Sequence, residues 1–305
     1  MPYGNSNEAG SRVIRRVLAR RRCLQVFHGS VIRVAPEWQQ QFERLGLFDP
    51  LNWRVPIDAP PVSHSKMAVA CYRIPLPDGR VMYFKRYDYR HSRRHRFRFW
   101  MRPSRAGVEQ FGYTRYHKLG IETPRIVGFG EYRKLGTLTS SFIATEEVPG
   151  SMTLEDFVEK TTSADAAAGD GRKLTDFAVR LLANLRKAHT ACLFHYDFKW
   201  RNILIQQRDG EYYPVIIDCP RAFVSRLRRR YGITTDLSAL GRAALAYLSL
   251  QQRYRLLAAY LGDSCGPAER KYWYRRVQRH YERRESKSAL PRDSLLRGVH
   301  FALRS

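Results

Sequence analysis

Acidic residues are scarce in this sequence. Only 28 Asp and Glu stand against 54 Lys and Arg, so the formal net charge of the 305-residue chain is +26. This excess carries no information on the fold, because net charge governs solubility and association rather than architecture. It does predict attraction to polyanions such as nucleic acid, an anionic membrane surface or a phosphorylated glycolipid.

Long apolar runs and paired cysteines are missing as well. The stretch AALAYLSL near residue 245 is among the longest apolar runs, whereas a membrane-spanning helix needs about 20 such residues. No apolar segment follows the charges at the N-terminus, so we expect neither a transmembrane segment nor a cleaved signal peptide. The five cysteines are dispersed, which is typical of reduced thiols in the cytoplasm and argues against a structural zinc site.

Residues 1–22 form a basic N-terminal segment, the first of three expected parts of the chain, before 23–147 and 148–305. Its first ten residues are small and polar, and we expect this segment to be partly disordered. Residues 12–22, RVIRRVLARRR, alternate aliphatic and basic residues at roughly helical spacing. They predict either a solvated surface helix or an interfacial helix that presses its aliphatic residues into a membrane.

A β-hairpin is predicted between residues 71 and 86. The runs CYRIPLP and RVMYFKR are rich in β-branched and aromatic residues and flank Asp78-Gly79, which is a strong short-range hairpin signal. Lys85 is expected near the end of the second strand. Ser104 has the character of a helix N-cap, and the helix is expected to end before Gly120. With IETPRIVGFGEYR and LTSSFIATEEV as further strands, the first half is expected to be a sheet with one helix.

The pattern changes at Pro149-Gly150. LEDFVEK and LTDFAVRLLANLRKAH have the spacing of amphipathic helices, and TTSADAAAGDG between them is typical of a flexible loop. Two short strands, NILIQQ and YYPVIID, are expected around Asp209-Gly210, and helices from Asp236 onward. A small sheet-rich N-lobe followed by a larger helical C-lobe is an α+β arrangement.

The run HYDFKWRN contains the most informative spacing in the chain, His195-x-Asp197-x-x-x-x-Asn202. Phosphoryl transfer needs positioning and charge neutralisation around the γ-phosphate. Asp197 can orient an acceptor hydroxyl, Lys199 can contact the phosphate, and Asn202 can hold Mg²⁺ through an oxygen. Asp218, which ends the apolar strand PVIID, offers a second metal contact. This spacing is that of a kinase catalytic loop and its later metal-binding Asp, and it predicts an ATP- and Mg²⁺-dependent phosphotransferase.

A kinase also needs a strand lysine for the α- and β-phosphates and a helix carboxylate that pairs with it. Lys85 in YFKRY is the expected lysine, although a strand lysine taken alone is usually a solvent contact. Glu109 is the only acid between Asp88 and Glu122, so it is the candidate partner. The alternative for Glu109 is a solvated carboxylate on the helix.

These residues and their order resemble those of the bacterial lipopolysaccharide core kinases, the Kdo and heptose kinase family, which has a protein-kinase-like fold. The resemblance covers roughly residues 67–250 and rests on YFKRY, PSRAGVEQFGYTRYHKLGIETP, EEVPG, LRKAHTACLFHYDFKWRNILI, IIDCPRA and DLSALGRAAL. It implies a two-lobed fold, ATP and Mg²⁺ as cofactors, and a lipopolysaccharide inner-core sugar as the phosphate acceptor.

The resemblance also implies how the nucleotide is held. Lys85 and Glu109 would form the ion pair that positions the phosphates. Glu146, Glu147 and Val148 would form the interlobe hinge that meets adenine.

On the catalytic loop, the resemblance implies that Asp197 is the base, that Asn202 and Asp218 bind Mg²⁺, and that Asp236 braces the loop from a helix. The histidines of this region, His189 and His195, would be structural.

The sequence departs from the wider kinase pattern at three places. No GxGxxG precedes the hairpin, and the corresponding stretch HSKMAVACY has no glycine; Ser65 and Lys66 could instead contact the phosphates through their side chains. Cys219-Pro220 follows Asp218 where protein kinases have Phe-Gly, which argues against a regulatory flip of that segment. Cys192 takes a turn position where kinases often have glycine.

The stretch from Lys85 to Arg105 carries nine Lys or Arg and one acid, Asp88, with aromatic residues interleaved. Three interpretations remain open: a surface for an anionic glycolipid or membrane, a solvated loop, and a site for single-stranded nucleic acid, whose bases stack on aromatic rings. Nucleic acid is the less favoured partner. The basic helix ERKYWYRRVQRHYERR is expected to add to the positive electrostatic field of this stretch.

Together with the resemblance, which implies heptose or Kdo of the lipopolysaccharide core as the acceptor, the sequence predicts a cytoplasmic sugar kinase, peripheral on the cytoplasmic face of the inner membrane. One alternative is a kinase of another acceptor, a protein or a small molecule; the basic charge argues against a cationic aminoglycoside. A second alternative is a non-catalytic pseudokinase or nucleic-acid-binding module.

Overall fold

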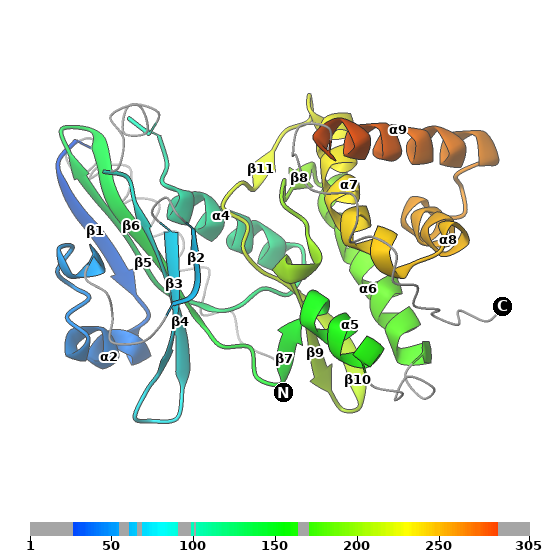
Figure 1. Ribbon diagram of the computed structural model, residues 1–305. Helices are drawn as coiled ribbons and strands as arrows, with labels where there is room; N and C mark the ends of the chain where they lie inside the picture. The colour runs from blue at the N-terminus through cyan, green and yellow to red at the C-terminus, as the bar shows by residue number, and fades with distance from the viewer. Residues whose placement is uncertain are drawn as a thin grey trace. The chain divides into compact units, whose positions relative to one another are not determined.

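The computed structural model describes residues 27–54, 61–65, 69–90, 99–100, 102–163 and 171–285 (Figure 1). The expected N-terminal helix at residues 12–22 and most of the expected loop at residues 161–171 lie outside this described part. The chain divides into two compact units. The first runs up to Gln110 and includes Arg125–Glu147, and the second comprises Phe111–Pro124 and the chain from Val148 onward.

The first unit is built on an antiparallel sheet that has six strands among the described residues, in the order β1-β5-β6-β4-β3-β2. The strands are β1 (Gly29–Val34), β2 (Pro61–Ser65), β3 (Val69–Pro75), β4 (Val81–Asp88), β5 (Ile126–Lys134) and β6 (Thr137–Glu146). β3 and β4 form the predicted hairpin, and β5 and β6 are the two further predicted strands. β1 and β2 were not predicted. They are the two edge strands, each paired with a single neighbour.

The hairpin places Lys85 in the interior of the sheet. Gly79 has a left-handed backbone in the turn, with φ of 80°, a conformation that glycine adopts without steric cost. Lys85 pairs with Cys71 on β3 and with Ile143 on β6. The expectation that Lys85 lies near the end of its strand was wrong, because the strand continues to Asp88 between two neighbours.

Aromatic side chains form the core of the first unit. Phe84 and Phe142 stack with ring centroids 5.0 Å apart, and Trp53 meets Phe142 edge-on at 4.7 Å. Gly130 makes this packing possible, because a Cβ there would lie 2.4 Å from the Phe142 ring and 2.6 Å from Trp53. Short helices supply further core residues: the 3-10 helices Pro36–Trp38 and Asn52–Arg54, and α2 (Gln39–Arg44). This core holds β4 in place, and Lys85 with it.

The predicted helix is α4 (Arg105–Lys118), and both of its predicted ends are confirmed. The Ser104 hydroxyl accepts a hydrogen bond from the Gly107 N–H at 2.8 Å, which satisfies one of the unpaired N–H groups of the first turn. Gly120 follows the helix with a left-handed φ of 63°, as is common at helix C-termini.

The second unit is rich in helices. Its helices are α5 (Leu154–Ser163), α6 (Gly171–Thr190), α7 (Arg229–Tyr247), α8 (Leu250–Leu261) and α9 (Pro267–Glu285), besides the 3-10 helix Trp200–Asn202. Its strands form the sheets β10-β9-β7 and β11-β8, with β7 (Ser151–Thr153), β8 (Leu193–Phe194), β9 (Ile203–Arg208), β10 (Glu211–Ile216) and β11 (Phe223–Val224). The predicted α+β class, with sheet first and helices after, is confirmed.

None of the helices in the described part of the chain is long and apolar enough to cross a membrane.

Helix α7 begins at Arg229, seven residues before the predicted start at Asp236. Gly232–Ala239 is buried throughout, so this stretch lacks the polar and apolar faces by which an amphipathic helix is detected. The hydroxyls of Thr234 and Thr235 donate to the carbonyls four residues earlier, which satisfies them inside the protein.

Replacement of Gly232 by alanine is expected to destabilise the second unit. A Cβ at this position would lie 2.3 Å from the buried ring of Phe194 on β8, and overpacking of this kind typically costs about 1–3 kcal/mol. The melting temperature should fall by several degrees. Gly241→Ala on the same helix is the matched control, because its Cβ meets nothing within 4 Å. That variant should be neutral or slightly more stable, and equal effects of the two changes would contradict this account of α7 packing.

Candidate active site

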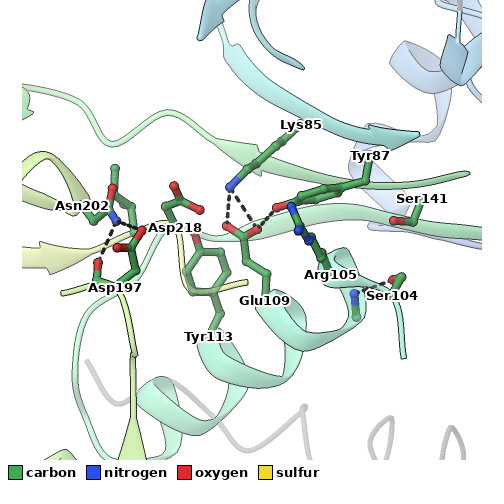
Figure 2. Close-up of polar contacts among 12 residues, drawn as sticks. Lys85, Tyr87, Ser104, Arg105, Glu109, Tyr113, Ser141, Asp197, Asn202 and Asp218 are labelled. Atoms are coloured by element: carbon green, nitrogen blue, oxygen red, sulfur yellow. Dashed lines mark hydrogen bonds and ion pairs between the residues drawn. The ribbon is translucent and has the colours of Figure 1, made fainter. Parts of the chain in front are cut away.

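The predicted strand lysine and helix carboxylate form an ion pair in the first unit. Lys85 Nζ lies 3.2 Å from Oε2 and 3.4 Å from Oε1 of Glu109 (Figure 2). Glu109 is only 2% exposed, and the Tyr87 hydroxyl donates to the same Oε2 at 2.8 Å. A buried carboxylate requires such partners, because its desolvation is costly. The arrangement holds an ammonium group at a fixed place on an interior strand, where it can bind phosphate oxygens.

Two aromatic residues of the basic stretch 85–105 are structural. Tyr87 and Tyr89 are buried, and the Tyr89 hydroxyl accepts the Arg105 N–H at 2.9 Å and contacts Ser141 Oγ at 3.3 Å. Burial raises the pKa of Tyr89 from 10.0 to about 12, so the hydroxyl stays protonated at neutral pH. Of the three open interpretations of this stretch, the nucleic-acid one needs exposed rings for base stacking, and these two rings are buried. Residues 91–98 lie outside the described part of the chain.

The catalytic-loop motif brings three predicted residues together in the second unit. Lys199 Nζ lies 2.7 Å from Asp197 Oδ1. The Asn202 side chain donates through Nδ2 to the Asp197 carbonyl at 2.8 Å and reaches Oδ2 at 3.5 Å. The Asp197 carboxylate and the Lys199 ammonium group thus share one short loop. The Asn202 amide lies beside them, and the hydrogen bond that its Nδ2 donates fixes its orientation.

Asp236 braces this loop from α7, as the resemblance implied. Its carboxylate is fully buried and accepts the N–H of His195 at 2.8 Å and that of Tyr196 at 2.7 Å. His189 Nε2 lies 3.2 Å from the same carboxylate, and the Tyr260 hydroxyl contacts His189 Nδ1 at 2.7 Å. The N–H groups that immediately precede Asp197 therefore have fixed acceptors, which holds the loop backbone in one conformation.

His195 is structural too. The Asp197 N–H donates to His195 Nδ1 at 3.3 Å, so the ring proton lies on Nε2, which faces the Ile217 carbonyl at 3.1 Å. This neutral tautomer uses both ring nitrogens inside the loop. Neither nitrogen is left for metal binding or proton transfer to a substrate.

The β9-β10 hairpin brings the two predicted metal ligands to the same end of a sheet. Ile203 pairs with Ile216, and the Ile217 N–H donates to the Asn202 carbonyl at 3.0 Å. Asp218 is the next residue along the chain (Figure 2). Because Nδ2 of Asn202 is used within the loop, its Oδ1 is the atom that remains for a cation.

These donors fit Mg²⁺. Among the described residues no group of three or more His, Cys, Asp or Glu is placed to hold a metal ion. Mg²⁺ favours a different arrangement, in which one or two protein oxygens are combined with water and substrate phosphates. The amide and carboxylate oxygens of Asn202 and Asp218 supply that donor set.

Tyr113 on α4 is a site residue that the sequence analysis missed. Its hydroxyl accepts the Asp218 N–H at 2.9 Å. Asp218 has a left-handed φ of 54°, an uncommon conformation for a residue with a side chain, and the hydrogen bond fixes it there. The neighbouring Gly112 lets the segment approach closely, because a Cβ would lie 2.5 Å from Cys219 Sγ. A tyrosine beside a helix glycine was the available signal.

The predicted hinge residues already have partners. The Glu147 carboxylate binds Arg73 at 2.8 Å, and the main-chain N–H of Glu147 donates to the Val81 carbonyl at 3.0 Å. The Glu146 carboxylate faces Arg125 at 3.6 Å, and the Val148 carbonyl accepts the Ser151 hydroxyl at 2.7 Å. A contact with adenine would therefore have to use other main-chain groups of this segment. The predicted phosphate contacts of the Ser65 and Lys66 side chains lie outside the described residues.

A cavity of about 590 Å³ lies on the helices α6 and α8, away from the motif residues. Its lining is mostly apolar, and it consists of Leu119, Val179, Leu182, Ala183, Arg186, Lys187, Thr190, Ala191 and Ala259. None of the predicted site residues belongs to this lining.

Comparison with known proteins identifies the family. The model of the "Lipopolysaccharide kinase (Kdo/WaaP) family" matches residues 77–260, which are 184 of the 305 residues. A search of curated proteins found no match. The solved structure described as "WaaP in complex with acyl carrier protein" is similar, with a TM-score of 0.59 and 20% identity over 84% of this chain and 98% of that chain.

At that identity the structural likeness speaks for the fold alone, and it confirms the predicted protein-kinase-like architecture. The family model spans more than half of the sequence, including the hairpin strand with Lys85, the loop with Asp197 and Asn202, and Asp236. The chain belongs to the lipopolysaccharide kinase (Kdo/WaaP) family.

Proposed function

We propose that the protein transfers the γ-phosphate of ATP to a hydroxyl of heptose or Kdo in the inner core of lipopolysaccharide. Membership of a kinase family supports phosphate transfer. The observation that carries the proposal is the catalytic loop, in which Asp197 contacts both Lys199 and Asn202. The same loop is joined by one hairpin to Asp218.

In this proposal Asp197 accepts or orients the proton of the attacking sugar hydroxyl. Lys199 is ion-paired with Asp197 at 2.7 Å, so its ammonium group lies beside the base and can neutralise charge on the transferring phosphoryl group. Lys85 holds the α- and β-phosphates, and Glu109 keeps the Lys85 side chain in position. The main chain of Glu146–Val148 contacts the adenine.

Asn202 Oδ1 and the Asp218 carboxylate would hold Mg²⁺, which neutralises negative charge on the nucleotide phosphates when bound. The Tyr113 hydroxyl and the Asp236 carboxylate hold the backbone of the two segments that carry these ligands. We place the protein on the cytoplasmic face of the inner membrane, where a chain with a formal net charge of +26 is attracted to anionic lipid.

The test is transfer of label from the γ-phosphate of ATP, with Mg²⁺, to dephosphorylated lipopolysaccharide core. Heptose-terminated and Kdo-terminated cores, a generic protein substrate and a small-molecule acceptor are compared in parallel. Label in one core glycolipid and not in the other acceptors supports the proposal and names the sugar. Transfer to a different acceptor keeps the kinase and rejects the glycolipid.

A protein that binds neither ATP nor any acceptor would be a non-catalytic module. Binding to nucleic acid that needs no ATP and weakens steeply with salt would favour that second alternative.

Replacement of Lys85 by methionine is expected to lower kcat/KM for ATP by about 10²-fold, in line with the loss of one preorganised electrostatic contact. The long apolar side chain preserves much of the packing of β4 but leaves Glu109 without its ammonium partner. Steady-state kinetics with varied ATP measure the effect. Lys160→Met on the exposed face of α5 is the matched control and should behave as wild type. An unchanged KM and kcat in Lys85→Met would rule out the phosphate-binding role.

A further inference from the structure

One segment of the second unit exposes apolar side chains together with arginine. The segment Phe223–Tyr231, FVSRLRRRY, follows the Asp218-Cys219-Pro220 run and leads into α7. Leu227 is 100% exposed, Tyr231 52%, Phe223 48% and Val224 39%. A single exposed apolar residue needs no explanation, but four of them within nine residues, interspersed with arginine, indicate an interaction surface.

The charge of this segment is of one sign. Its arginines are Arg226, Arg228, Arg229 and Arg230, with Arg221 just before it, and no Asp or Glu occurs between Asp218 and Asp236. Within the described part of the chain no ion pair involves any of these guanidinium groups. Arginine in the first turn of a helix is also unfavourable, because the helix dipole is positive there. Stability of the fold therefore does not account for these residues.

The segment is tied directly to the catalytic loop. β11 pairs with β8 (Figure 1) through Phe223↔Phe194 and Val224↔Leu193, and β8 is followed at once by His195. The ring of Tyr231 lies 6.1 Å from that of Tyr196 within the loop. A surface that engages this segment would thus hold the catalytic loop close to it.

We propose that Phe223–Tyr231 docks the protein on an anionic lipid bilayer. Leu227, Phe223 and Val224 enter the boundary between headgroups and acyl chains, and the arginines contact lipid phosphates. This combination of exposed apolar side chains and unpaired arginine is the composition that binds at a membrane interface. The inference rests on the proposed function in one respect: a kinase whose acceptor is a membrane glycolipid must work at that surface.

Lipid fits this segment better than nucleic acid. Single-stranded nucleic acid is bound by aromatic rings on which bases stack, whereas the most exposed apolar residue here is Leu227, which has no stacking face. An aliphatic side chain gains free energy by leaving water for hydrocarbon, which only the bilayer offers. Nucleic acid would satisfy the arginines and leave the aliphatic residues unexplained.

The experiment is co-sedimentation of the full-length protein with phosphatidylcholine vesicles that contain or lack phosphatidylglycerol. Wild type should bind the anionic vesicles far more tightly. Leu227→Ser should weaken this binding by about tenfold, as expected for one buried aliphatic side chain. Arg228→Gln/Arg230→Gln should weaken it by about 25-fold, on the basis of about fivefold for each basic residue near the surface.

The matched controls are Leu250→Ser, a second exposed leucine of the same unit, and Lys160→Gln/Arg172→Gln on α5 and α6. These should bind vesicles as wild type does. Losses in the controls equal to those in the segment variants would overturn the proposal, because attraction would then be spread over the whole basic surface. So would binding to single-stranded RNA but not to vesicles.

Kinase assays separate this inference from the proposed function. Leu227→Ser should phosphorylate a water-soluble, deacylated core as wild type does, and should be slower only on core glycolipid embedded in anionic vesicles. If no core is phosphorylated by wild type but vesicle binding depends on the segment, the docking surface stands and the proposed reaction falls. If cores are phosphorylated but the segment variants bind vesicles normally, the reaction stands and the docking surface falls.

Discussion

Replacement of Asp197 by alanine is expected to lower the turnover of phosphate transfer by roughly 10²- to 10⁴-fold, the usual contribution of a positioned general base. Binding of Mg²⁺-ATP should be nearly unchanged, because Asn202 and Asp218 keep their oxygens. The fold should also survive, because Asn202 donates to the main-chain carbonyl of residue 197 rather than depending on its side chain. Label transfer measures turnover, and titration calorimetry measures nucleotide binding.

Two further variants sharpen this test. Asp197→Asn keeps the shape of the side chain and should be almost as inactive, since the amide is a far poorer base. Asp263→Ala removes an exposed carboxylate in the loop after α8 and should retain full turnover. Asp197→Ala with turnover close to that of wild type would remove Asp197 from the reaction and leave the loop a structural turn.

Replacement of Asp236 by alanine is expected to abolish turnover and to destabilise the second unit. The carboxylate accepts the N–H groups of His195 and Tyr196 and contacts His189 Nε2, so its loss leaves two buried donors and one part-buried donor without an acceptor. Breaking such a buried charged network typically costs about 3–5 kcal/mol. For a unit of this size that corresponds to a melting temperature lower by about 10 °C. Calorimetry and label transfer on the same preparation measure both effects.

The control for Asp236 is Tyr260→Phe. It removes only the hydroxyl that contacts His189 Nδ1 from the side opposite Asp236, and it should cost about 1 kcal/mol with turnover retained. Burial raises the pKa of Tyr260, so this hydroxyl is neutral in wild type and its removal changes no charge. Equal losses of turnover in the two variants would mean that the network as a whole, rather than the bracing carboxylate, sets the loop.

Local signals in the sequence were sufficient for several elements. Asp78-Gly79 between two β-rich runs predicted the β3-β4 hairpin, and Ser104 with Gly120 predicted both ends of α4, because turns and helix caps depend on residues close in sequence. The spacing of HYDFKWRN likewise predicted the loop that joins Asp197, Lys199 and Asn202. Glu109 was found by elimination, since the neighbouring stretch contains no other acid.

Features that depend on distant neighbours were not predictable in this way. Tyr113 meets Asp218 across 105 residues of sequence, and the neighbouring Gly112 is the one local feature that sets it apart from Tyr116 on the same helix. In the sequence, Tyr87 and Tyr89 were interpreted together with the neighbouring arginines as part of one basic-aromatic stretch. In the structure their hydroxyls contact Glu109 and Ser141, which are distant in sequence. The early start of α7 was missed for a related reason: Gly232–Ala239 is buried throughout, so this stretch has no periodic pattern to detect.

The small residue after Asp218 has a consequence for inhibitor selectivity. In protein kinases an aromatic side chain occupies that position, and its packing distinguishes active from inactive states. Here Cys219 is fully buried, lies against Gly112, and is followed by Pro220, whose ring restricts the backbone. Displacement of this thiol would open a space of little more than one sulfur atom. Compounds that lock kinases by filling the room vacated by an aromatic ring should therefore spare this protein.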